Sequence, residues 1–139
     1  MCLQCLRFQV LATIRKFEDL EIWQLARQLS QQVLFISKNT ELKNDYLFKD
    51  QIKASSGSVM DNIAEGFERD GNVEFRQYLS IAKGSFGEVR SQCYRLFDSE
   101  YIAEEKMVEL VTECEQISKR IANFISYLNK KDFKGNKFK

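Results

Sequence analysis

The sequence predicts an all-α fold, an antiparallel up-and-down four-helix bundle. The 139 residues include no proline and only six glycines, although the many turns of an all-β chain draw on both residues. Four segments carry apolar residues at alternating steps of three and four, which is the spacing of one buried helix face. Polar connections of roughly 4–8 residues separate these segments, and such short connections make successive helices antiparallel neighbours.

The first two helices are expected over residues 19–38 and 45–67. Glu18 and Asp19 place negative charge at the start of the first helix, where the helix dipole favours it. The stretch 54–58 is rich in serine and glycine, but the apolar period is in phase on both sides of it, so we interpret it as helix. The predicted buried seams are Ile22, Ala26, Leu29, Val33 and Ile36 in the first helix and Phe48, Ile52, Ser55, Val59 and Ile63 in the second.

The last two helices are expected over residues 72–97 and 103–129, each with an apolar seam that has no slip. A repeat of 3.5 residues packs helices at about 20°, which is bundle geometry. The two seams are Phe75, Leu79, Ala82, Phe86, Val89, Cys93 and Leu96, and then Met107, Leu110, Cys114, Ile117, Ile121, Phe124 and Leu128.

Further apolar residues lie off these seams and predict a second apolar face. They are Val73, Tyr78, Ile81, Val108, Val111, Ile125 and Tyr127. A monomeric bundle rarely exposes that much apolar surface, so the pattern indicates self-association. The alternative is that some of these residues widen the internal stripe.

The charge pattern divides the chain into an N-terminal arm (1–16), the bundle (17–129) and a basic C-terminal tail (130–139). The net charge is only +1, but the arm holds three cations and no acid, and the tail holds five lysines against Asp132. The bundle between them is therefore acidic. Basic ends on an acidic body are typical of contact with polyanions through tails.

Composition argues against an enzyme, a cofactor and a metal. Histidine is absent, which removes the usual general base and the commonest metal ligand. Cys2 and Cys5 form one C-x-x-C without the second pair that a zinc site needs, so an inert end is the alternative to a redox or metal role. Cys93 and Cys114 fall on apolar positions and are interpreted as small hydrophobic residues. Neither a secretory signal nor a membrane span is recognised, so a cytoplasmic protein with no membrane contact and no small-molecule substrate is expected.

Two basic features are candidates for binding RNA or DNA. Four cations recur every seven residues and would form one stripe able to grip a phosphate backbone: Arg69, Arg76, Lys83 and Arg90. The alternative is a solvated face paired with acids such as Glu105, Glu109 and Glu113. The tail lysines could neutralise phosphates while Phe133 and Phe138 stack on bases, or the tail could simply be a solubilising end. These lysines are Lys130, Lys131, Lys134, Lys137 and Lys139.

Residues 16–128 resemble the four-helix-bundle proteins encoded in 23S ribosomal RNA intervening sequences. The resemblance is carried by residues 17–23 (FEDLEIW), 50–55 (DQIKAS), 62–67 (NIAEGF) and 81–85 (IAKGS), with Glu74, Phe75, Leu79 and Glu88. It implies a ring-like homo-oligomer, a pentamer, without enzymatic activity. Retroelement accessory proteins similar to this family bind a reverse transcriptase and nucleic acid. The chain departs from the family pattern at Met60, commonly a proline, and at Gly71, commonly a serine.

The polar residues of the family motif allow two interpretations. Glu65 with Lys83 could suggest acid–base chemistry, but no nucleophile or oxyanion site accompanies them. The simpler interpretation is structural, with Glu65 pairing with a cation and Gly84 permitting a close contact. The structural set consists of Asn62, Glu65, Gly66, Gly84 and Ser85. The sequence therefore predicts a non-catalytic homo-oligomer that contacts RNA or DNA. The alternative is a protein-binding scaffold or accessory subunit with no direct nucleic-acid role.

Overall fold

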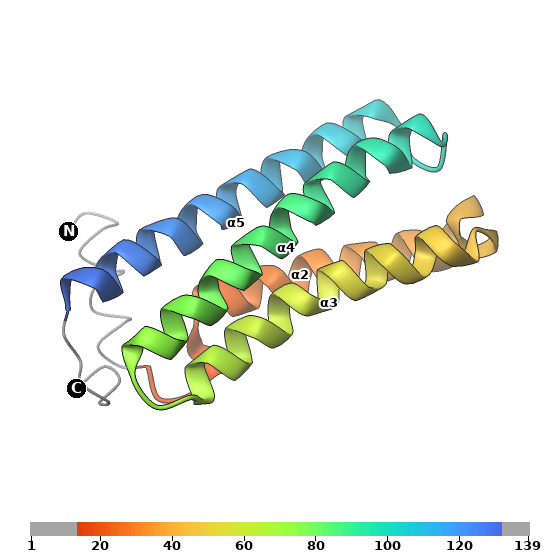
Figure 1. Ribbon diagram of the computed structural model, residues 1–139. Helices are drawn as coiled ribbons and strands as arrows, with labels where there is room; N and C mark the ends of the chain where they lie inside the picture. The colour runs from red at the N-terminus through yellow and green to blue at the C-terminus, as the bar shows by residue number, and fades with distance from the viewer. Residues whose placement is uncertain (1–13, 132–139) are drawn as a thin grey trace.

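The computed structural model describes residues 14–131. Four α-helices run alternately up and down and lie lengthwise against one another (Figure 1). They are α2 (Glu21–Asn39), α3 (Tyr46–Glu68), α4 (Asn72–Asp98) and α5 (Glu104–Lys130), and two short 3-10 turns, η1 (Phe17–Asp19) and η2 (Glu41–Asn44), accompany them. Each helix contacts the next and α2 also contacts α5. The predicted antiparallel four-helix bundle is confirmed for the described part of the chain.

The helices begin and end within two residues of their predicted bounds. The largest difference is at the start of α2, which the sequence placed at Asp19. There the Asp19 carboxylate accepts the backbone N–H of Arg15 at 3.3 Å, and residues 17–19 close a 3-10 turn instead. Leu20 follows in an extended conformation and is 1% exposed. The Leu20 side chain is buried in the core, and its extended backbone ends the 3-10 turn before α2 begins.

The serine-rich stretch of α3 is helical, as predicted. The hydroxyls of Ser55 and Ser56 donate to the carbonyls of Ile52 and Lys53, both at 3.2 Å. Such bonds to the preceding turn let serine remain inside a helix. The helix is also continuous through Met60, where the family commonly has a proline.

Side-chain caps fix some helix ends and are missing at others. Asp45 accepts the backbone N–H of Phe48 at 3.3 Å and so caps α3. Its other carboxylate oxygen accepts the Tyr101 hydroxyl at 2.8 Å, and this bond raises the pKa of Tyr101 above its ordinary value. Gly71 precedes α4 with φ at +90° and offers no side-chain cap. The chain therefore lacks the side-chain cap that a serine at this position would give α4, and a glycine turn with positive φ leads into the helix instead.

All the predicted seam residues are buried, and they form one core along the bundle. Phe75 lies at the centre of an aromatic cluster at the end where α3 joins α4. Its ring centroid is 5.9 Å from that of Phe67 and 5.5 Å from that of Phe124. Edge-to-face contacts of this kind add to the burial of apolar area.

The predicted second apolar face is only partly exposed. Val73, Ile81 and Val108 are 60%, 53% and 53% exposed. Val111 is a correction, because it is buried in the core at 7% exposure. Three further residues of the set are half-buried: Tyr78, Ile125 and Tyr127. The stripe inside the bundle is thus wider than the seams, and a smaller set of apolar side chains faces outward.

Candidate functional site

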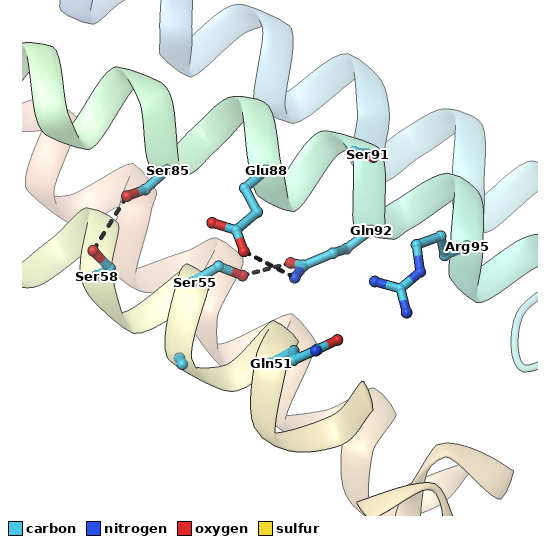
Figure 2. Close-up of a pocket in the computed structure, with 9 residues that line it drawn as sticks. Gln51, Ser55, Ser58, Ser85, Glu88, Ser91, Gln92 and Arg95 are labelled. Carbon is cyan, nitrogen blue, oxygen red and sulfur yellow. Dashed lines mark hydrogen bonds between the residues drawn. The ribbon is translucent and has the colours of Figure 1, made fainter. Parts of the chain in front are cut away.

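A polar seam lies between α3 and α4, where most of the bundle's interior is apolar. The Ser55 hydroxyl donates to the Gln92 side-chain carbonyl, and the Gln92 amide reaches Glu88 at 3.5 Å (Figure 2). Ser55 and Gln92 are 5% and 3% exposed. Because buried polar groups cost free energy when unpaired, their mutual bond holds the two helices in one register.

The seam continues toward the α3–α4 turn through small side chains. The hydroxyls of Ser58 and Ser85 lie 3.2 Å apart. Asn62 donates its amide to the Ser58 carbonyl at 2.8 Å and to the Ser58 hydroxyl at 2.9 Å. Ser85 of the motif set thus bonds across to α3, and Asn62 supports its partner Ser58 from within α3.

Beside this seam the surface between α3 and α4 is hollowed into an open groove of about 500 Å³. Its lining consists of Gln51, Ala54, Ser55, Ser58, Ser85, Glu88, Ser91, Gln92 and Arg95. In Figure 2 the side chains of Gln51 and Arg95 point toward one another across it, and that of Gln92 points toward Ser55 and Glu88. The groove combines hydroxyls, amides, one carboxylate and one guanidinium, which suits polar recognition and gives no nucleophile with an adjacent base.

A second polar cluster closes the turn between α3 and α4. Glu65 pairs with Arg69 at 2.9 Å, and the Tyr78 hydroxyl lies within hydrogen-bond distance of both, at 3.2 and 3.0 Å. The hydrogen bond from Arg69, reinforced by the one from Tyr78, lowers the pKa of Glu65 below its ordinary value. Glu65 therefore pairs with a cation, as its structural interpretation expected.

The close contact that the sequence assigned to Gly84 belongs to Gly66 instead. A Cβ atom on Gly66 would lie 2.6 Å from Cβ of Tyr78 and 3.1 Å from Cδ1 of Phe75. A Cβ atom on Gly84 would meet nothing within 4 Å. Gly84 is on the outward face of α4, whereas Gly66 is on the face of α3 that crosses α4. Gly66, near the end of α3, is therefore the motif glycine that lets α3 and α4 approach closely.

The predicted basic stripe is split between two sides of α4. Arg76 donates to the Asn129 side chain and Arg90 pairs with Glu115 at 3.7 Å, so both flank α5. Lys83 lies between them in helical phase and is exposed. Arg69 lies in the turn after α3, outside the phase of α4, and faces Glu65 and Tyr78. The acid partner on α5 is Glu115, whereas Glu109 pairs with Lys106 and Glu113 accepts from Gln32.

This division also keeps Glu65 away from Lys83. Glu65 contacts α4 from the α3 side, and Lys83 shares the side of α4 that faces α5. The two groups proposed for acid–base chemistry are thus not brought together.

The end of α5 is tied to the start of α4. The Asn72 amide donates to the carbonyls of Leu128 and Lys131, at 2.8 and 2.7 Å. Lys130 and Lys131 are exposed there, and the Lys131 ammonium lies 5.9 Å from the Tyr127 ring centroid. These lysines therefore lie beside Arg76, at the same end of the bundle. Lys134 and Lys137 are outside the described residues.

The two cysteines of the core are small buried side chains, as their apolar positions predicted. Cys93 and Cys114 are 0% and 1% exposed. A hydrogen bond with Cys93, together with burial, raises the pKa of the Cys114 thiol far above its ordinary value. Cys2 and Cys5 are outside the described residues. Within residues 14–131 no three potential metal ligands gather, and no helix is both long and apolar enough to cross a membrane.

Comparison with known proteins assigns the chain to a family. The model of the 23S rRNA-intervening sequence protein family matches residues 18–123. The chain belongs to this family. A crystal structure of a protein with unknown function from the S23 ribosomal protein family of Bacteroides thetaiotaomicron has the same fold, with a TM-score of 0.68 and 21% identity over 76% of this chain and 95% of that one. No curated protein matches the chain.

Four of the five motif residues of this intervening-sequence protein have structural contacts in the bundle, and Gly84 is the exception. Asn62, Glu65, Gly66 and Ser85 all lie on the α3–α4 side of the bundle. Sequence reasoning missed Gln92, Ser58 and Asn72. A serine or glutamine at a position between apolar residues is a weak signal, because helical period alone does not say which neighbouring helix a flanking side chain faces.

Proposed function

We propose that the protein is a non-enzymatic helical bundle that works as a homo-oligomer. The supporting observation is a set of large apolar side chains on the outer surface of the bundle. Leu47, Val73, Ile81 and Val108 are 73%, 60%, 53% and 53% exposed. Their transfer from water is worth about 25 cal/mol per Å² when a second copy covers them. A ring of about five copies is the expected size, carried over from the family resemblance.

The mass of the full chain in solution tests this proposal. Light scattering after size exclusion, over a hundredfold range of concentration, is expected to give a stable multiple of 16.3 kDa. A mass of one chain throughout that range contradicts self-association.

Contact with RNA or DNA is the second candidate, favoured by the cations that gather where α4 starts and α5 ends. Lys130 and Lys131 are exposed beside Arg76, and Lys83 extends the same side of α4. Arg90 contributes less, because its ion pair with Glu115 offsets its positive charge. Neighbouring lysines that form no ion pair with a described residue are able to displace counterions from a phosphate backbone.

Titration of a structured RNA at two salt concentrations tests this second candidate. Binding is expected to weaken steeply with salt and to lose most of its salt dependence when residues 130–139 are removed. A triple variant, Glu104→Gln, Glu105→Gln and Glu109→Gln, changes the net charge in the same sense as added lysines but at the opposite end of the bundle, so it controls for global charge. Failure to bind at either salt concentration leaves the scaffold or accessory role as the remaining binding function.

A further inference from the structure

The groove between α3 and α4 carries two charges of opposite sign that no described residue pairs. Glu88 and Arg95 both line the groove and both are exposed. Within residues 14–131 neither forms an ion pair, whereas Arg69, Arg90, Lys106 and Arg120 all do. In the part of the chain that the structure describes, the Glu88 carboxylate accepts one hydrogen bond, the long one from the Gln92 amide at 3.5 Å.

Arg95 is nevertheless held in place. Its guanidinium carbon lies 4.2 Å from the centroid of the Phe48 ring. Stacking on an aromatic face uses the plane of a guanidinium and leaves its N–H edges free for an acceptor. In Figure 2 these edges point into the groove. Arg95 is therefore a preorganised donor without an acceptor among residues 14–131.

The spacing of the two charges makes this face complementary to itself. Glu88 and Arg95 are seven residues apart on α4 and share one side of that helix, about 10 Å apart along its axis at 1.5 Å per residue. If a second copy lies antiparallel on this face, each Glu88 meets the other copy's Arg95. A contact in which the same patch serves both copies is isologous and has a two-fold axis.

Small side chains lie where that axis would pass. Ser91 is halfway between the two charges on α4, and Ala54 lies level with it on α3; both line the groove and both are exposed. Side chains of this size let two helix surfaces approach closely, which brings the flanking charges within reach of one another. We propose that the α3–α4 groove is a two-fold docking face for a second copy of this chain, held by two reciprocal Glu88–Arg95 ion pairs.

A polyanion fits this groove less well. Glu88 points its carboxylate into it (Figure 2), and a phosphate backbone would bring negative charge against that group. The two charges cancel, so the groove offers no net attraction for nucleic acid. A protein surface with one acidic and one basic side chain at the same spacing pairs with both Glu88 and Arg95.

The inference rests on the proposed self-association and adds a second contact to it. A ring closes through head-to-tail contacts, which are heterologous, whereas the α3–α4 contact is isologous. Rings that carry it would join in pairs, so the full assembly contains an even number of copies. Two rings of five would contain ten copies.

Charge reversal tests the contact, with the mass of the full chain as the measurement. Glu88→Arg and Arg95→Glu each place like charges together in both reciprocal pairs, so each variant alone is expected to have half the wild-type mass. An equimolar mixture of the two variants restores both pairs between unlike chains, and the double variant restores them between like chains. Both are expected to recover the wild-type mass. Circular dichroism confirms that each variant is folded.

Control reversals on other surfaces separate this effect from general changes of charge. Glu105→Arg and Lys119→Glu alter exposed residues of α5 and are expected to keep the wild-type mass. The wild-type mass is also expected to halve in about 1 M salt, where ion pairs at a surface are screened. Single reversals that keep the wild-type mass, or a mixture that fails to recover it, overturn the docking face while the homo-oligomer stands. A wild-type protein of one chain overturns both.

Discussion

At the residue scale, Gly66 shows how one missing methyl group sets the distance between two helices. Its Cα faces the Tyr78 side chain, and an added Cβ would lie 2.6 Å from Tyr78 Cβ. Because the obstructing atom is attached directly to the α4 backbone, the helix itself would have to move. The turn cluster of Glu65, Arg69 and Tyr78 lies on the same contact, so a shift here would also break its hydrogen bonds.

We therefore expect Gly66→Ala to destabilise the fold by about 1–3 kcal/mol, the usual cost of overpacking. Gly57→Ala is the matched control on the same helix, because a Cβ there meets nothing within 4 Å. It should raise the stability by about 0.5–1 kcal/mol through helix propensity. Urea unfolding measures both, and a neutral or stabilising Gly66→Ala contradicts the close approach.

The Glu65 carboxylate predicts a pH dependence of stability. Its folded-state pKa is below the ordinary value of 4.5, chiefly because Arg69 donates to the ionised form. A group with a lowered folded-state pKa stabilises the fold at pH values above 4.5, and this stabilisation disappears as the pH falls through the folded-state value. Glu65→Gln should therefore unfold at lower urea than wild type at pH 7, and the difference should shrink below pH 4.5.

Glu68→Gln controls for the loss of one negative charge, since Glu68 is exposed and near the same turn. A gap between wild type and Glu65→Gln that stays constant from pH 7 to pH 3 would show that Arg69 does not stabilise the ionised carboxylate.

At the element scale, the helices could be predicted closely and their partners could not. A seam such as Phe75, Leu79 and Ala82 reports which side of α4 is buried, because burial repeats with the helical period. The same period does not indicate which neighbouring helix is faced by a residue beside the seam. Arg69 and Arg76 are seven residues apart, yet the turn at Gly71 puts them on opposite sides of α4. Gln92 gives only a weak sequence signal, since its partner Ser55 is on another helix.

The seam of α4 gives a prediction for packing. Phe86 is 1% exposed, so Phe86→Ala should cost about 3–5 kcal/mol through lost burial and an unfilled cavity. Phe35→Ala makes the same chemical change on α2, where the side chain is 67% exposed, and should change the stability by less than about 0.5 kcal/mol. Equal effects of the two substitutions on thermal unfolding would place Phe86 outside the core.

The tie between α4 and α5 predicts local opening rather than global unfolding. Asn72→Ala removes two hydrogen bonds to carbonyls near the end of α5, each worth about 1 kcal/mol. The amides of the last turn of α5 should exchange with solvent faster, while those at its middle keep their protection. Gln77→Ala, at an exposed position one turn further along α4, is the control for hydrogen exchange. Unchanged exchange near residue 130 contradicts the tie.

At the scale of the whole molecule, both proposed functions depend on the surface of the bundle. The interior is filled along its length, and the polar groups that enter it hold helices in register. The groove between α3 and α4 and the exposed apolar side chains of the helices are the outward features. Sequence patterning predicted that apolar residues lay off the seams, but burial of Val111 and exposure of Ile81 depend on how far each helix is rotated, which only the packed bundle reveals.

The measurement that tests self-association most directly is the mass of the Ile81→Glu variant. Ile81 is 53% exposed on α4, and a charge there should leave the core intact but repel an apolar neighbour. We predict a folded variant with the helicity of the wild type, whose mass falls to at most two copies of the 16.3 kDa chain. A variant that keeps the assembled mass of the wild type would contradict the account, because Ile81 would then face water in the working protein.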